Sequence, residues 1–186
     1  MKNVILLCVL IALLSSSSFA QGPLFGVKGG INVATIGRDP DVTGVSLGFH
    51  FGGFVQVYKS DHIILQPEAI FSLQGASLKG DFSPRANYRY LNFPVIFKYY
   101  PGFSGIHLQA GPQIGVLFSG EISSTVLDIP FLSHLNPVDY VFAIGIGFDH
   151  DDLLIDLRYN YGLNSTEPDA GYIPGRTFQF SLGYIF

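Results

Sequence analysis

Charged residues are scarce in this chain. Asp, Glu, Lys and Arg make up 13% of its 186 residues, about half of the ~25% found in soluble domains. After residue 20, no apolar run approaches the about 18 residues of a membrane-spanning helix. The net charge of −4 argues against a nucleic-acid partner, which requires a basic surface. A chain with so little charge and no membrane helix needs another way to accommodate its apolar residues.

The N-terminus has the form of a signal peptide. Lys2 provides the charged start, Val4–Leu14 is apolar, and Ser18-Phe19-Ala20 fits a signal-peptidase site. This apolar run is too short to span a bilayer as a helix, which takes about 20 residues. We therefore expect residues 1–20 to be a cleaved signal peptide and 21–186 to be one domain. Cleavage also removes Cys8, the only cysteine, so the mature chain has no disulfide and no thiol chemistry.

Alternation of apolar and polar residues runs through the whole mature chain. At the C-terminus, every second residue from Phe178 to Phe186 is large and apolar, while the residues between them are small or polar. This period of two predicts strands, and Gly or Pro punctuates nearly every gap. The eight predicted strands are 24–33, 45–58, 63–75, 88–99, 106–118, 139–148, 153–163 and 177–186.

Sorting each strand by parity separates two faces. One face is apolar and contains no charged residue. The other combines glycines with amides and ions, and its candidate interior polar network is Lys28, His50, Glu68, Lys98, His107, Asp139, Asp156 and Arg158. Glu68 with Lys98, and Asp156 with Arg158, are the ion pairs that this arrangement suggests.

Two architectures share this pattern. A soluble barrel of the lipocalin type turns the apolar face inward, whereas a membrane barrel turns it towards lipid. An eight-stranded barrel has an interior just wide enough for side chains to fill, and several dozen large apolar residues do not fit there. We therefore predict an all-β fold, an eight-stranded antiparallel up-and-down transmembrane β-barrel.

The gaps between strands support the membrane barrel. Short gaps at 59–61, 100–103 and 149–152 alternate with long gaps at 34–44, 76–87, 119–138 and 164–175. Outer-membrane barrels alternate short periplasmic turns with long external loops in this way. We expect an outer-membrane location with both termini in the periplasm.

Two further features refine this prediction. Aromatic residues near the strand ends, including Tyr88, Tyr100 and Phe186, predict girdles at the membrane interfaces. Pro67, Pro94 and Pro112 lie within predicted strands, where each removes a ladder donor. We expect bulges or local bends at these three prolines.

Several stretches resemble the PorT-like outer-membrane β-barrel family. They are "GVKGGIN" (26–32), "LQPEAIFSLQGA" (65–76), "YLNFPVIFKYY" (90–100), "AGPQIGVL" (110–117), "RYNYGL" (158–163) and the final "GYIF". The resemblance implies an integral outer-membrane barrel and supplies no catalytic residues. The namesake of the family is linked to protein secretion across the outer membrane, so the resemblance implies an envelope protein partner. A final Phe also resembles the signal by which the barrel-assembly machinery recognises its substrates.

The interior ions leave three classes of function open. The first is a structural or partner-binding barrel, in which the ions form a salt-bridged plug, because buried charges must be paired. The second is a narrow pore for ions or small solutes. The third is an outer-membrane hydrolase, with His50 and Glu68, or His107 and Asp139, acting on Ser46 or Ser72, although no motif selects such a trio.

One long gap is unusually apolar. The stretch 126–135 contains a candidate partner-binding set, Val126, Leu127, Ile129, Phe131, Leu132 and Leu135, and an exposed apolar patch often marks an interaction site. The other reading is that it folds over the barrel mouth. The expected partners are therefore outer-membrane lipid and lipopolysaccharide, the assembly machinery and an envelope protein. No enzyme activity, metal site or cofactor is expected.

Overall fold

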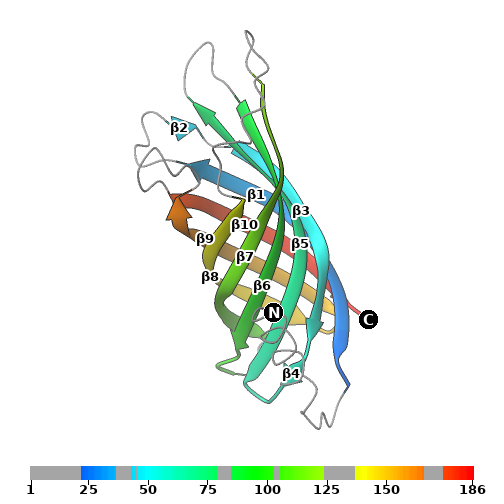
Figure 1. Ribbon diagram of the computed structural model, residues 1–186. Helices are drawn as coiled ribbons and strands as arrows, with labels where there is room; N and C mark the ends of the chain where they lie inside the picture. The colour runs from blue at the N-terminus through cyan, green and yellow to red at the C-terminus, as the bar shows by residue number, and fades with distance from the viewer. Residues whose placement is uncertain are drawn as a thin grey trace, which may run out of the picture.

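The computed structural model describes residues 22–36, 43–44, 46–78, 85–102, 105–123, 137–165 and 174–186. Every regular element among them is a strand (Figure 1). The strands are β1 (Leu24–Ile36), β2 (Thr43–Gly44), β3 (Ser46–Gln56), β4 (Tyr58–Lys59), β5 (Ile63–Leu78), β6 (Arg85–Tyr99), β7 (Ile106–Ser123), β8 (Val138–His150), β9 (Leu153–Ser165) and β10 (Pro174–Ile185). In the described part of the chain, no helix is long and apolar enough to cross a membrane. The predicted signal peptide, residues 1–20, lies outside the described residues.

Eight long strands close into one antiparallel barrel, which confirms the predicted fold. Their order around the wall is β1, β3, β5, β6, β7, β8, β9 and β10, with β10 paired again to β1. The β1–β10 ladder runs from Gly26 opposite Ile185 to Ile36 opposite Gly175. The short strands β4 and β2 pair with the two ends of β5. Closure leaves the membrane-spanning part of the wall without an open edge, whose unpaired backbone groups would be costly in lipid.

The two ends of the barrel differ. The turn end carries the connections 57–62, 100–105 and 151–152 together with both ends of the described chain, where Phe186 N–H donates to Phe25 O at 2.9 Å. The other end, the loop end, carries the longer connections. There β7 continues to Ser123, beyond its last register pair with β8, Val116 opposite Val138. Together β5, β6 and β7 extend past the other strands (Figure 1).

The prolines within strands do not produce the predicted bulges. Register continues unchanged across Pro67 and Pro94, although the ladder omits two successive pairs beside each of them, and Pro112 lies directly opposite Phe142. The shift between β6 and β7 falls at Arg89 and Tyr90 instead. A bulge is defined by one extra residue in one of two paired strands. The prolines remove N–H groups and therefore ladder hydrogen bonds, but they insert no extra residue.

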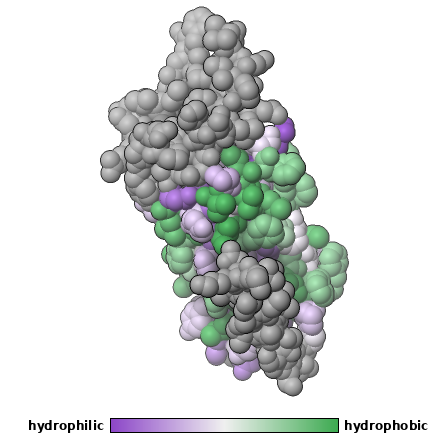
Figure 2. All heavy atoms as spheres, viewed as in Figure 1, coloured by the Kyte–Doolittle hydropathy of each residue, from purple (hydrophilic) through white to green (hydrophobic). Residues whose placement is uncertain are grey.

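Side chains separate by face as the alternation predicts. The outward face is apolar and exposed, with Ile31, Phe93, Ile144, Leu157 and Phe180 all more than 40% accessible. Figure 2 shows hydrophobic residues gathered across the middle of the molecule, over the strands. The inward face buries charged and amide side chains.

The prediction that Tyr88 and Tyr100 belong to the aromatic girdles at the membrane interfaces is wrong. Tyr88 is 5% exposed and lies among the inward residues of β6. The Tyr100 hydroxyl donates to the Asp149 carboxylate, which belongs to the inward face of β8. Both tyrosines therefore contribute to filling the barrel ends, where a phenol can bury its ring and still hydrogen-bond.

Candidate functional site

The turn-end half of the lumen contains an ionic layer formed by Lys28, Glu68, Lys98, Asp149, Asp156 and Arg158. These side chains come from five strands, with Asp156 and Arg158 both on β9, and alternation turns each of them inward. Five are almost fully buried, and Asp149 retains 15% side-chain exposure. The layer balances three cations with three anions, as buried charges require.

Glu68 is the centre of this layer. Arg158 grips it with two parallel hydrogen bonds, Nη1 to Oε2 and Nη2 to Oε1, both 3.0 Å, a geometry that strengthens an ion pair. Lys28 Nζ bridges Glu68 Oε1 at 3.3 Å and Asp156 Oδ2 at 2.9 Å. Gln66 donates to Glu68 Oε1 at 2.8 Å. The Glu68–Arg158 pair therefore crosses the lumen between the opposite strands β5 and β9, and Lys28 on β1 links Glu68 to Asp156.

The two ion pairs suggested by the sequence are wrong. Glu68 pairs with Arg158 and Lys28, and Lys98 lies 3.3 Å from Asp149 instead. Asp156 pairs with Lys28 instead of its neighbour Arg158. Long side chains in a narrow barrel reach across the lumen, and the sequence pattern gives the face of each side chain without the depth at which it meets side chains from other strands.

A second cluster lies at the turn end, where Asp149 meets His107 and Tyr100. Tyr100 donates to Asp149 Oδ2 at 2.5 Å, and its ring lies 5.1 Å from that of His107. Burial and the hydrogen bond to Asp149 raise the pKa of Tyr100, so the phenol remains a donor. His107 is fully buried and lies between the carboxylates of Asp149 and Asp156.

The loop-end half of the lumen is mainly neutral and includes an ordered contact among Asn32, His50 and Ser181. His50 Nε2 is 2.8 Å from Ser181 Oγ, and Nδ1 is 2.7 Å from Asn32 Oδ1. This order of contacts is that of a nucleophilic triad. All three residues are at most 3% exposed, and Asn32 also donates to Ser72 Oγ at 2.9 Å. These contacts fill and fix the lumen, and they replace the predicted association of His50 with Glu68 and a serine at 46 or 72.

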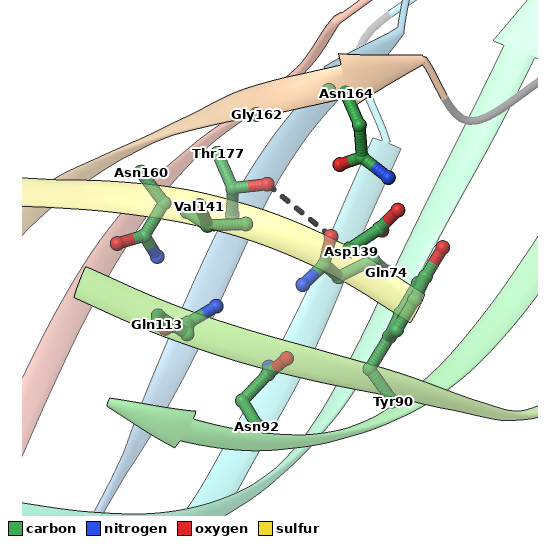
Figure 3. A pocket seen from close by; sticks show the side chains of 11 residues that line it. Gln74, Tyr90, Asn92, Gln113, Asp139, Val141, Asn160, Gly162, Asn164 and Thr177 are labelled. Carbon is green, nitrogen blue, oxygen red and sulfur yellow. Dashed lines mark hydrogen bonds between the residues drawn. The ribbon is translucent and has the colours of Figure 1, made fainter. Parts of the chain in front are cut away.

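A small polar cavity of about 30 Å³ lies nearer the loop end (Figure 3). Gln74, Tyr90, Asn92, Gln113, Asp139, Val141, Asn160, Gly162, Asn164, Gly175 and Thr177 line it. Thr177 donates to Gln74 Oε1 at 3.4 Å, whereas both amide atoms of Asn160 and Nδ2 of Asn92 are buried without a hydrogen-bond partner. The volume suits about two water molecules, which would satisfy these amides.

The eight predicted interior residues lie in three different parts of the lumen. Six belong to the ionic layer or its His107 neighbour, His50 contacts Asn32 and Ser181, and Asp139 lies apart at the loop-end cavity. The candidate partner-binding residues 126–135 lie outside the described residues. Asp149 and Tyr100 were missed because both were assigned to turns, although the inward parity of β8 already includes position 149.

An antiparallel barrel that is closed, apolar outside and filled with paired ions inside is an integral outer-membrane β-barrel. The comparisons agree with this class. The family model described as "Outer membrane protein beta-barrel domain" matches residues 19–167. The chain belongs to this family, and the family places it in the outer membrane.

Solved barrels share the fold. Ail, the attachment invasion locus protein of Yersinia pestis, is 14% identical and superposes with a TM-score of 0.52 over 89% of this chain and 100% of that one. Neisserial surface protein A is 11% identical, with a TM-score of 0.61 and the same coverage. At these identities the likeness concerns the fold alone. A search of curated proteins gives no match.

Proposed function

We propose that this protein is a non-conducting, non-enzymatic outer-membrane barrel that serves as an anchor and binds a partner protein of the envelope. The observation that carries the proposal is the cross-lumen network, in which Arg158, Glu68, Lys28 and Asp156 link opposite walls. A solute would have to break several buried ion pairs to pass. In a barrel of eight strands, where side chains fill the interior, such a network acts as a plug.

The surface available for a partner lies at the loop end. There β5, β6 and β7 continue past the other strands and extend the wall at this end (Figure 1). The resemblance to PorT-like barrels, whose namesake is linked to protein secretion, supports a role in an envelope assembly. The apolar stretch 126–135, between β7 and β8, is the candidate docking segment from the sequence.

The proposal also includes an orientation. The long loops face outward, towards lipopolysaccharide, and the turn end with both termini faces the periplasm, as in outer-membrane barrels generally. Insertion through the barrel-assembly machinery is part of the proposal, and the aromatic row of β10, which includes Phe178, Phe180 and Tyr184, supports it.

Co-purification tests partner binding. Intact protein and a variant lacking 126–135 are extracted from native outer membranes in mild detergent and compared. We expect a stoichiometric partner with the intact protein that is lost with the deletion. A barrel that purifies alone in both samples would contradict the docking role.

Planar-bilayer recording tests the plug. We expect no conductance above background from the folded wild-type barrel. Steady single-channel currents that change in the double variant Lys98→Ala with Glu68→Ala would favour the pore instead.

A further inference from the structure

His107 lies between two carboxylates at the turn end of the lumen. Its Nδ1 is 3.6 Å from Asp149 Oδ1, and its Nε2 is 3.3 Å from Asp156 Oδ1. One ligand atom from each of the three residues lies within 4.8 Å of the others. The residues come from three adjacent strands, β7, β8 and β9, so the wall itself holds them in place.

Among the polar atoms that face one another in this cluster, Asp156 Oδ1 accepts a hydrogen bond from Gln109 Nε2 at 3.1 Å, and the others have no hydrogen-bond partner in the described part of the protein. Both ring nitrogens of His107 and Oδ1 of Asp149 are buried without a hydrogen-bond partner, and His107 is 0% exposed. Buried polar atoms are nearly always paired. A neutral imidazole supplies one lone-pair nitrogen and a carboxylate supplies oxygen lone pairs, so these unpaired groups offer a nitrogen and an oxygen ligand to a bound cation.

The remaining carboxylate oxygens are already held. Tyr100 and Lys98 contact Asp149 Oδ2 at 2.5 and 3.3 Å, and Lys28 contacts Asp156 Oδ2 at 2.9 Å. Each carboxylate thus has its Oδ2 fixed from behind, while its Oδ1 faces the imidazole. Metal-binding carboxylates are oriented by outer hydrogen bonds in this way.

A glycine keeps the space open. Gly147 lies directly opposite both His107 and Asp156 in the sheet. A Cβ added there would lie 2.5 Å from His107 Nε2 and also clash with the Asp156 carboxylate. The absence of a side chain at 147 therefore gives the imidazole and the carboxylate access to a common space.

We propose that His107, Asp149 and Asp156 form a binding site for a single divalent transition-metal ion of the zinc class. One imidazole and two carboxylates supply nitrogen and oxygen ligands that Zn²⁺ accepts, with positions left for water. The ion would cross-link three neighbouring strands at the end of the barrel where Asp149 still reaches solvent.

The cations Lys28, Lys98 and Arg158 balance Glu68, Asp149 and Asp156 in the surrounding layer, so a bound dication adds positive charge to a balanced group of ions.

The test uses the full mature barrel, purified without a polyhistidine tag and shown to be folded by its heat-dependent migration in gels. Co²⁺ and Zn²⁺ are titrated separately, with visible absorption reporting Co²⁺ and calorimetry reporting Zn²⁺. The matched control replaces the exposed histidines of the same end, His62→Gln with His150→Gln.

We expect a single Co²⁺ per chain, bound by the wild type and the control. His107→Gln should abolish this binding because it removes a ligand. Gly147→Ala should also abolish it, because the added Cβ fills the space between His107 and Asp156 while all three ligands remain. Tyr100→Phe, which releases Asp149 Oδ2, should weaken it by about 10–100-fold. Asp149→Asn provides a further variant if either of the first two fails to fold. Absence of binding by the wild type, or binding that survives in folded His107→Gln or disappears in the exposed-histidine control, would overturn the proposal.

Discussion

At the scale of single residues, the interior gains its order from charges that are individually expensive to bury. Lys98, Glu68 and Arg158 are all at most 5% exposed. Each such ion loses its hydration, and the loss is offset only when partners and hydrogen bonds surround it. The bidentate contact of Arg158 with Glu68, reinforced by Gln66, provides that environment. Removing one residue of an ion pair should therefore lower the free energy of unfolding more than replacing both residues with uncharged ones.

The pair Glu68 and Arg158 provides the test. Glu68→Ala leaves the Arg158 guanidinium buried without its carboxylate, and we expect a loss of about 3–5 kcal/mol in the free energy of unfolding. Glu68→Ala with Arg158→Met removes both charges and should recover much of that loss. The measurement is urea unfolding of the barrel in lipid vesicles. Strictly additive losses in the double variant would contradict the coupling of this pair.

At the scale of elements, the strands could be predicted where one face contacts lipid and the other fills the lumen. The alternation predicted all eight long strands. It placed the ends of β5 and β7 at residues 75 and 118, whereas these strands continue to Leu78 and Ser123. The residues there, Gly-Ala-Ser-Leu at 75–78 and Ser-Gly-Glu-Ile-Ser at 119–123, do not continue the alternation of large apolar and polar residues, so the pattern ends before the strands do. The inward residues could likewise be predicted by parity, whereas their partners depend on the depth at which side chains from different strands meet in the lumen.

The outward face of β10 gives a prediction for an element. Phe180 lies opposite Ile31 of β1 and Leu157 of β9, all apolar and exposed towards lipid. Phe180→Arg should therefore cost about 2–4 kcal/mol, whereas Phe186→Arg at the turn-end rim should cost only about 0–1 kcal/mol. Urea unfolding in vesicles of defined thickness measures both. Equal costs at the two positions would mean that β10 does not cross the hydrocarbon as the fold requires.

At the scale of the whole molecule, function is divided between the barrel and its ends. A wall of eight strands whose lumen is filled by ion pairs leaves the two ends as the surfaces where other molecules can bind. The turn end carries the unpaired polar atoms of His107 and Asp149. The loop end carries the continuation of β5 to β7 and the small amide-lined cavity. Which end faces the outside therefore decides which partners each can meet.

Single cysteines determine this orientation, because the mature chain predicted from the sequence has no cysteine of its own. Pro137→Cys places an exposed thiol at the loop end, and Asp151→Cys places one in the exposed turn between β8 and β9. In intact cells, we expect a membrane-impermeant maleimide to label position 137 and to label position 151 only after the outer membrane is permeabilised. Labelling of purified, folded protein shows that both thiols react. The reverse pattern in intact cells would place the turn end and both termini outside, and would move the search for a partner of the loop end to the periplasm.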